Sequence, residues 1–329
     1  MSDVAKLAGV GTMTVSRVLN DNPRVSEENR NRVLSAIAEL NYVPNEVARS
    51  LREQRARQIG IIVPTIRDPF FAICSDAVST VAKANNYSVV LAISGEDPEV
   101  EFKEAARLLR RSIDGLVVIP AARGRSRLGD PAFANLPIVA VDRPAGRADT
   151  DCVVVENERG AYEGTRHLIE HKHRRIVHLS LARDLYTMQM RIRGYRQAMK
   201  EAGLTPQVEV TTGTPEDTLQ VIRNTLRTEA PPTALFCANN VVSCSVFHAL
   251  SALHIAVPEQ IAVAGFDDFE TADILKPAMT VVRQPFEDLG RHAAEILFAR
   301  LEKRGKKRQN RTHRVVLPVE LIVRKSCGC

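Results

Sequence analysis

From Ile59 to the C-terminus, short apolar runs alternate with stretches of helical periodicity, and this alternation constrains the fold more than any other feature. The apolar runs are IGIIVPTI, YSVVLAIS, DGLVVIPA, PIVAVD, RIVHLSL, ALFCAN and IAVAGFDD. The helical stretches include residues 101–110, 159–171, 194–202 and 215–226. Near-continuous apolar strands separated by helices indicate parallel sheets covered by helices on both faces. The sequence therefore predicts an α/β fold.

The apolar runs are too many for one sheet of modest size, so we expect two α/β subdomains with a cleft between them. Ligands bind beyond the carboxyl ends of strands in such sheets. We expect the chain to cross between the subdomains near Asn157, Gln284 and Pro318. The predicted N-subdomain then spans about 59–157 and 285–317, and the predicted C-subdomain spans about 158–284 and 318–329.

The first 44 residues have a different pattern, which predicts three short helices in a small domain. Val4, Leu7 and Ala8 form one side of the first helix. Ser26 is placed to cap the third helix, whose apolar positions Val33, Ile37 and Leu40 follow helical spacing. Some forty residues make a marginal core, so we expect support from a larger body or a partner.

The composition of residues 45–58 differs from that of the segments on either side. We expect these residues to link the small domain to the α/β core at 59–329. The first half of this linker, 46–52, has the pattern of one or two helical turns. A helix so short is unstable in isolation, which predicts a segment that is helical only under some conditions.

The net charge of +6 does not by itself indicate nucleic acid, because one segment accounts for it. Between Arg300 and Arg314 eight Lys or Arg residues stand against Glu302 alone, a local charge of +7. The simplest interpretation of this segment is a solvated loop. The chain has no run of eighteen apolar residues and no secretion-type start, so we expect a cytoplasmic protein that does not span a membrane.

The six cysteines follow no regular spacing, and reduced thiols are expected in the cytoplasm. Cys327-Gly328-Cys329 offers two ligands for a soft metal, which is too few for a site, so a frayed tail is the preferred interpretation. His171 and His173 do not share a helix face. Neither a metal nor a cofactor is therefore expected.

Sequence signatures of catalysis are missing from the chain. It contains no G-x-G-x-x-G after a strand, no phosphate-binding Gly-Lys-Ser/Thr loop, no G-x-S-x-G elbow and no H-E-x-x-H. Binding rather than catalysis is the expected role.

The segment VGTMTVSRVLN, residues 10–20, predicts a helix with two chemically distinct sides. Val15, Val18 and Leu19 lie on one side. The other side carries Thr12, Met13, Ser16, Arg17 and Asn20, with Thr14 on the flank. Hydroxyls and Arg can bond phosphates or guanine edges in the major groove, and an apolar tip can touch a thymine methyl. A surface helix with a stray methionine explains the helix alone equally well.

The context of this helix decides between the two interpretations. DVAKLAGVGTMTVSRVLN followed by PRVSEENRNRVLSAIAELNYVPNEVARSL resembles the DNA-binding headpiece of the lactose-repressor family. The resemblance continues through IGIIVPTIRDPFFA, DGLVVIPA, RIRGYRQAM, IAVAGFDD and VELIVRKS, and so covers essentially the whole chain. It implies a helix-turn-helix headpiece, a hinge helix that inserts a leucine into the minor groove, and a periplasmic-binding-protein-like core that dimerises and binds a small effector.

Positions that match the family's DNA-binding pattern can be named in this chain. Thr12 and Met13 match the pair that most distinguishes operators. The resemblance assigns phosphate or base-edge contacts to Thr14, Ser16, Arg17 and Asn20, hinge contacts to Asn45 and Arg49, and the minor-groove wedge to Ala48 and Leu51. An apolar wedge between base steps kinks DNA. Gly11 departs from the family's usual Ser at the N-cap, at a cost of a few tenths of a kcal/mol.

The resemblance also points to effector-binding residues, namely Phe70, Phe71, Asp142, Arg191, Asn239 and Asp267. Carboxylate, guanidinium and amide groups can grip vicinal hydroxyls, while aromatic faces cover a ring. Asp142 and Asp267 could equally be caps, and each Phe could equally belong to the core. Two departures weaken the transfer of a particular effector: Asn239-Asn240 is followed by VVSCSV, and the VTTGTPED loop has no aromatic residue.

The resulting hypothesis is a cytoplasmic transcription regulator controlled by a small effector, most often a sugar or sugar derivative in this family. A homodimer, or a tetramer built from it, would bind a pseudo-palindromic DNA operator. The alternative is a solute-binding protein without a DNA function, and an enzyme is a distant third.

Overall fold

The computed structural model describes residues 1–19, 21–42, 56–121, 126–145, 150–181, 184–303 and 312–329. The chain divides into two compact units, Met1–Ala56 and Arg57–Cys329. Within the described residues, none of the helices combines the length and the apolar character needed to cross a bilayer.

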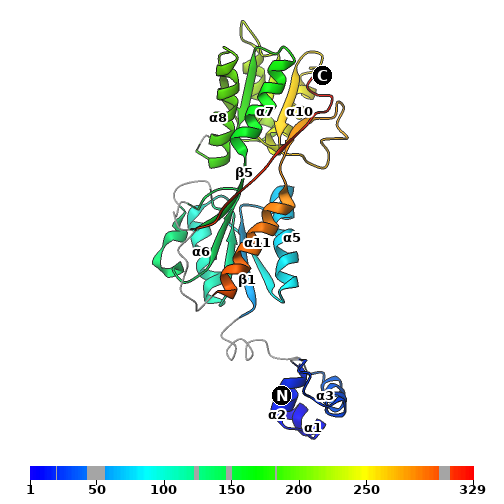
Figure 1. Cartoon of the computed structure of the whole chain (residues 1–329). Coiled ribbons are helices and arrows are strands. Elements are labelled where there is room, and N and C mark those ends of the chain that lie inside the picture. Colours follow the sequence, from blue (N-terminus) through cyan, green and yellow to red (C-terminus); the bar gives the residue numbers. More distant parts are fainter. Residues whose placement is uncertain (20, 43–55, 122–125, 146–149, 182–183, 304–311) are drawn as a thin grey trace. The chain divides into compact units, whose positions relative to one another are not determined.

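The described residues of the first unit form three helices, α1 (Ser2–Ala8), α2 (Thr12–Leu19) and α3 (Glu27–Glu39) (Figure 1). Its core is built on Val4, Val15 and Val33, one from each helix, all with no exposed surface. Ser26 caps α3 by accepting a hydrogen bond from the Asn29 N–H, as the sequence predicted.

Two leucines that were expected in this core lie outside it. Leu7 is 47% exposed, because α1 buries the side that carries Val4, Ala5 and Ala8, and Leu7 falls at the edge of that side. Leu40 is 43% exposed because it follows the last helical residue of α3 as its C-cap.

In the second unit, the residues that the structure describes form two six-stranded sheets. The first sheet has the order β11-β5-β4-β3-β1-β2, and all its strands are parallel. Its strands are β1 (Gln58–Val63), β2 (Ser88–Ile93), β3 (Gly115–Val118), β4 (Ile138–Val141), β5 (Asp151–Val155) and β11 (Arg314–Leu317). This sheet and its helices are called the N-subdomain below.

Helices cover both faces of the first sheet, as expected for parallel strands. Figure 1 shows α5 (Pro69–Ala84) and α11 (Phe286–Glu302) side by side on one face, and α6 (Pro98–Arg110) packs on the other. Two short 3-10 helices, Arg127–Gly129 and Pro131–Phe133, lie between β3 and β4.

The second sheet has the order β12-β10-β9-β8-β6-β7. Its strands are β6 (Ile176–Ser180), β7 (Gln207–Val210), β8 (Ala234–Cys237), β9 (Ala262–Phe266), β10 (Thr280–Arg283) and β12 (Glu320–Ile322). Its helices are α7 (Asn157–Glu170) and α8 (Tyr186–Glu201) on one face, and α9 (Pro215–Leu226) and α10 (Asn240–Ala252) on the other. This sheet and its helices are called the C-subdomain below.

The predicted α/β class with two sheets is confirmed, with one difference in strand direction. The chain passes between the sheets three times, after β5, after β10 and after β11. The last pass brings β12 back antiparallel to β10, so the second sheet is mixed rather than wholly parallel. Only three residues, Glu320–Ile322, form this edge strand, which is too little for the apolar pattern to reveal its direction.

Each subdomain contains one helix pair that approaches closely at a glycine. A Cβ at Gly194 of α8 would overlap the carbonyl oxygen of Glu158 in α7, and one at Gly290 of α11 would overlap the carbonyl oxygen of Cys74 in α5. Because only glycine permits such contact, Gly194 sets how closely α8 packs on α7, and Gly290 sets how closely α11 packs on α5.

The C-terminal tail is docked rather than frayed, contrary to expectation. Ser326 and Cys327 have no exposed surface. The Ser326 hydroxyl donates to the Val263 carbonyl at 2.6 Å, and Arg324 forms paired hydrogen bonds with Asp268 at 2.9 Å. Cys327 and Cys329 are joined as a disulfide, so the expectation of reduced thiols is wrong for this pair. Gly328 between them has a φ of 79°, which turns the chain back and brings the sulfurs together.

Candidate functional site

The surface of α2 has the two-sided character that its sequence predicted. Val15 and Val18 are buried, and Met13 is 69% exposed on the opposite side, next to the exposed Thr12 and Arg17. Thr14 and Ser16 are half-buried at its margins. An exposed apolar tip among hydroxyls and a guanidinium matches the chemistry of base edges and phosphates.

Gly11 directly precedes α2 and has no side chain that could cap the helix. Its carbonyl accepts hydrogen bonds from the N–H groups of Thr14 at 2.9 Å and Val15 at 3.2 Å. The remaining DNA-contact predictions, Asn20, Asn45, Ala48, Arg49 and Leu51, lie outside the described residues.

Asp142 and Asp267 occupy equivalent places in the two sheets. Each follows the last residue of a buried strand, β4 or β9, and each has a left-handed backbone, with φ of 68° and 73°. The Asp142 N–H donates to the Val153 carbonyl at 2.9 Å, and the Asp267 N–H donates to the Val282 carbonyl at the same distance. The carboxyl ends of both sheets therefore carry an acid, as predicted.

Arg191 lies beneath Asp267 and is only 2% exposed. Its Nε donates to Oδ1 of Asn157 at 2.9 Å, and its Nη1 donates to the Ala238 carbonyl at 2.6 Å and lies 3.7 Å from Oδ2 of Asp267. The guanidinium stacks 3.7 Å above the Phe266 ring. Burial lowers the pKa of Arg191, while the Asp267 and Asp142 carboxylates raise it. A buried cation is thereby held rigidly among acceptors.

Asp142 is held in a similar way by a cation from its own subdomain. Arg143 Nε lies 3.2 Å from Oδ2 of Asp142, and the same guanidinium donates to both carboxylate oxygens of Glu96 at 3.0 and 3.2 Å. Burial raises the pKa of Asp142, and the Arg143 charge opposes that rise.

Two amide side chains at this end of the sheets present oxygens without a partner. Asn240 Nδ2 donates to Oδ1 of Asp68 at 2.9 Å, and Gln284 Nε2 donates to Oδ1 of Asp267. A carboxylate can only accept, so these contacts fix which end of each amide is oxygen. Among the described residues, Asn240 Oδ1 and Gln284 Oε1 are buried and have no hydrogen-bond partner. Asp68 belongs to the N-subdomain and Asn240 to the C-subdomain, so the first contact bridges the two.

The other predicted effector residues are occupied in packing or capping. Phe70 and Phe71 are 6% and 8% exposed and join the core of the N-subdomain, where the Phe70 ring packs edge-on against Phe71 and Phe286. Asn239 caps α10, because its side chain accepts from the Val242 N–H at 3.0 Å.

Known proteins share both parts of this architecture. Residues 1–45 match the lacI family of bacterial regulatory proteins, and residues 165–327 match a periplasmic binding protein-like domain. The HTH-type transcriptional repressor PurR of Histophilus somni (strain 2336) is 33% identical over 99% of this chain and 98% of its own length. The chain belongs to the lacI family. PurR of Haemophilus influenzae (strain PittEE) is 35% identical over the same shares.

Solved structures of family members resemble this lacI-family protein along its length. The lac repressor dimer bound to operator and the anti-inducer ONPF has a TM-score of 0.88 at 26% identity, covering 99% of this chain and 98% of that one. The CelR regulator in complex with cellobiose has a TM-score of 0.73 at 30% identity, covering 98% of both chains. This lacI-family protein is therefore a DNA-binding repressor with an effector-binding core, and not an enzyme.

Sequence reasoning missed several residues of the core site in this lacI-family protein. Asn157 and Phe266 position Arg191, while Asp68, Asn240 and Gln284 form the amide contacts. Two signals were present, because Asp68 stands in the same DPFFA motif as Phe70, and Asn240 stands beside Asn239 in CANN. Gln284 had no local signal, since its role depends on β10 lying beside β9.

Proposed function

We propose that the effector is a sugar or sugar derivative bound at the carboxyl ends of the two sheets. The unpartnered oxygens of Asn240 and Gln284 carry this proposal, because they require hydrogen-bond donors from an occupant. Asp142 and Asp267 add further acceptors, and Arg191 supplies a donor. A molecule with several hydroxyls can donate to the acceptors and accept from the guanidinium. The buried Phe70 and Phe71 would form the apolar wall beside it.

Asn240 rather than Asn239 is our choice for the amide that contacts the effector. The Asn239 oxygen is engaged by the first turn of α10. The Asn240 oxygen is free, and its amide already links Asp68 of one subdomain to the other. An effector bonded to Asn240, Asp142 and Asp267 would therefore stabilise one arrangement of the subdomains over others.

The proposed DNA contacts come from α2 and the linker. Thr12 and Met13 would set operator preference, and Thr14, Ser16, Arg17 and Asn20 would hold phosphates or base edges. In the linker, Asn45 and Arg49 would contact the backbone, and Ala48 and Leu51 would enter the minor groove. Support for this proposal comes from the exposed Met13 and Thr12 beside the buried Val15. Residues 1–44 form the proposed headpiece, 45–58 the hinge and 59–329 the core.

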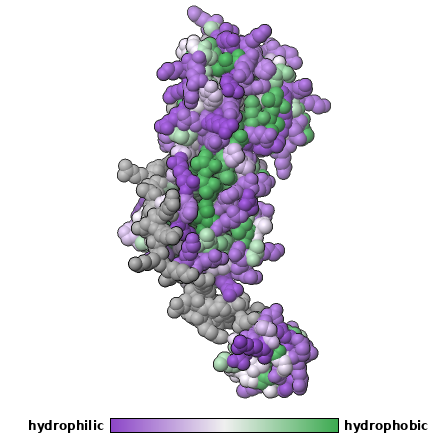
Figure 2. Space-filling view, in the orientation of Figure 1, coloured by the Kyte–Doolittle hydropathy of each residue, from purple (hydrophilic) through white to green (hydrophobic). Residues whose placement is uncertain are grey.

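A homodimer is the proposed assembly, and a pseudo-palindromic operator in the bacterial cytoplasm is its proposed target. The edge strand β2 exposes Leu91 and Ile93 by 44% and 46%, which is unusual for apolar residues on an open sheet edge. Figure 2 shows further apolar residues gathered on one face of the core. A two-fold dimer requires two half-sites related by the same axis. Effector binding would then change the spacing of the two headpieces, with a coupling of about 1–3 kcal/mol.

The effector is tested by thermal denaturation of the full chain with a panel of sugars, sugar acids and nucleosides. We expect one class of hydroxyl-rich compound to raise the melting temperature, and Arg191→Gln to abolish that rise. Stabilisation by nucleosides alone would contradict the sugar assignment. An equal rise in the Arg191→Gln protein would contradict the placement of the site.

A further inference from the structure

The docked C-terminal tail brings two sulfur atoms to the amino end of the second sheet. β12 runs antiparallel to β10, so the residues after it return to the place where β9 and β10 begin. Backbone N–H groups of Lys325 and Ser326 donate to the Ala278 carbonyl at 3.0 Å. The Thr280 hydroxyl lies 3.1 Å from Cys327 Sγ. These contacts place Cys327 and Cys329 in fixed positions, at the opposite end of the sheet from Asp267.

A histidine from α7 meets these sulfurs. His167 Nε2 lies 3.5 Å from Cys329 Sγ, and the residue is 9% exposed. One ligand atom from each of His167, Cys327 and Cys329 lies within 4.8 Å of the other two. Two ligands did not justify a site from the sequence, but the fold supplies a third.

The spacing and chemistry of these groups suit a thiophilic cation. In a tetrahedral zinc site with Zn–S of about 2.3 Å and Zn–N of about 2.0–2.1 Å, a sulfur and a nitrogen ligand are about 3.6 Å apart. The separation between His167 and Cys329 is already close to that value. Thiolate and imidazole ligands favour Zn²⁺ over Ca²⁺ or Mg²⁺, which prefer oxygen.

We propose that the reduced protein binds one Zn²⁺ ion through His167, Cys327 and Cys329, with His171 as the fourth ligand. His171 follows His167 by four residues, the spacing that places two imidazoles on one helix face, and the two ring centroids are 4.5 Å apart. His173 is engaged elsewhere, because its Nδ1 lies 3.1 Å from the Thr233 hydroxyl and the ring also hydrogen-bonds the backbone of Cys327. The ion would fasten the tail to α7.

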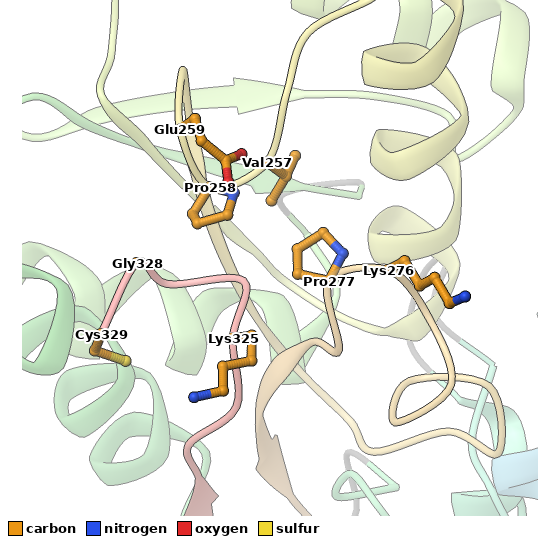
Figure 3. A pocket seen from close by; sticks show the side chains of 8 residues that line it. All are labelled: Val257, Pro258, Glu259, Lys276, Pro277, Lys325, Gly328 and Cys329. Carbon is orange, nitrogen blue, oxygen red and sulfur yellow. The ribbon is translucent and has the colours of Figure 1, made fainter.

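Cys329, one of the proposed ligands, also lines a depression of about 480 Å³. Figure 3 shows Cys329 at one side of its lining and Lys276 at the other, with Lys325 and Pro258 between them. The depression lies at the amino ends of β9 and β10, whereas effectors bind beyond carboxyl ends. The proposed metal site is therefore separate from the proposed effector site.

Binding requires that the disulfide between Cys327 and Cys329 be opened first. A phosphine reductant supplies the two electrons and becomes the phosphine oxide with oxygen from water, and each sulfur gains a proton. Zn²⁺ then displaces both thiol protons, so metal binding releases protons and weakens as the pH falls. The oxidised protein offers only imidazoles and should not bind.

The experiment titrates the reduced full-length protein with Co²⁺ and then Zn²⁺ under anaerobic conditions. We expect thiolate-to-cobalt charge-transfer absorption, displaced by one equivalent of Zn²⁺ per chain. Cys329→Ser replaces an exposed residue and should abolish the absorption, and His167→Gln should weaken Zn²⁺ binding by about tenfold or more. The oxidised protein should give no absorption.

Matched controls come from α10, which carries the exposed residues Cys244 and His248. Cys244→Ser and His248→Gln should leave Zn²⁺ binding unchanged. Circular dichroism of each variant checks that the fold is retained. Zn²⁺ binding that survives Cys329→Ser, or that is lost equally in Cys244→Ser, would overturn the proposal, as would a reduced protein that gives no charge-transfer band.

Discussion

Single buried polar residues determine the chemistry of the core. Arg191 and Asp142 are 2% and 6% exposed, and each is held by an oppositely charged partner. Leaving a buried donor or acceptor without a partner costs about 1–3 kcal/mol. Among the described residues the oxygens of Asn240 and Gln284 have no hydrogen-bond partner, so an effector that bonded to them would gain most there.

Replacing Asn240 by aspartate should impair effector binding at neutral pH. Asn240→Asp sets a carboxylate against Asp68, which now accepts from the amide at 2.9 Å. Like charges raise the pKa of a carboxyl group, so binding should fall by about tenfold or more and recover partly as the pH is lowered. Isothermal titration across the pH range measures this. Asn239→Asp is the matched control, because aspartate caps a helix as well as asparagine. Equal losses in the two variants would count against the assignment.

His178 should make the core less stable in acid. It has no exposed surface, its ring stacks between Tyr195 and Phe236, and burial lowers its pKa to about 3. Unfolding restores a pKa of about 6.5, so only the unfolded chain binds this proton between those values. The free energy of unfolding should fall by about 2 kcal/mol between about pH 7 and about pH 5.

Urea unfolding followed by circular dichroism at the two pH values measures this loss. His178→Gln cannot take up the proton, so the difference between its stabilities at the two pH values should be smaller by about the same amount. A variant with the wild-type pH dependence would show that His178 is not the cause.

Helices and strands could be predicted where a local sequence pattern marks them. Contacts between side chains far apart in the sequence could not be predicted. Apolar runs identified the strands β1 to β4, β6, β8 and β9, and helical spacing identified the two sides of α2, because burial repeats along a strand or helix. The strands β5, β7, β10, β11 and β12 were not among the predicted runs. Leu7 was wrongly predicted to be buried, because the side of α1 that faces the core is narrower than its apolar residues suggest. Asn240 and Asp68 are 172 residues apart, and no local pattern links them. The meeting of His167 with Cys329 likewise depends on the path of the chain through β12.

The exposed side of α2 should control which DNA sequence is selected. Replacing Thr12 and Met13 together should change the preferred operator without unfolding the headpiece, because Met13 is 69% exposed and contributes little to the core. Selection from a random duplex library measures the preference. Leu34→Ala, which removes an exposed apolar residue from α3, is the control and should keep the original operator. An equal loss of affinity for all sequences would contradict this role for the pair.

The whole molecule combines a small domain that carries DNA chemistry with a large core that carries ligand chemistry. Three buried valines, Val4, Val15 and Val33, hold the first unit together, and two sheets bring Asp142, Asp267 and Arg191 together in the second. In a repressor, effector binding to the core must alter the affinity of the small domain for DNA. Only the full chain can show this coupling.

The most direct test is equilibrium binding of the full-length protein to its selected operator and to a scrambled duplex, at several salt concentrations, with and without the stabilising sugar. We predict a preference for the operator of about a thousandfold or more at physiological salt. The sugar should change operator affinity by about 5- to 150-fold and leave scrambled-duplex binding nearly unchanged. Equal affinity for both duplexes, or an operator affinity that does not respond to a bound sugar, would contradict the account.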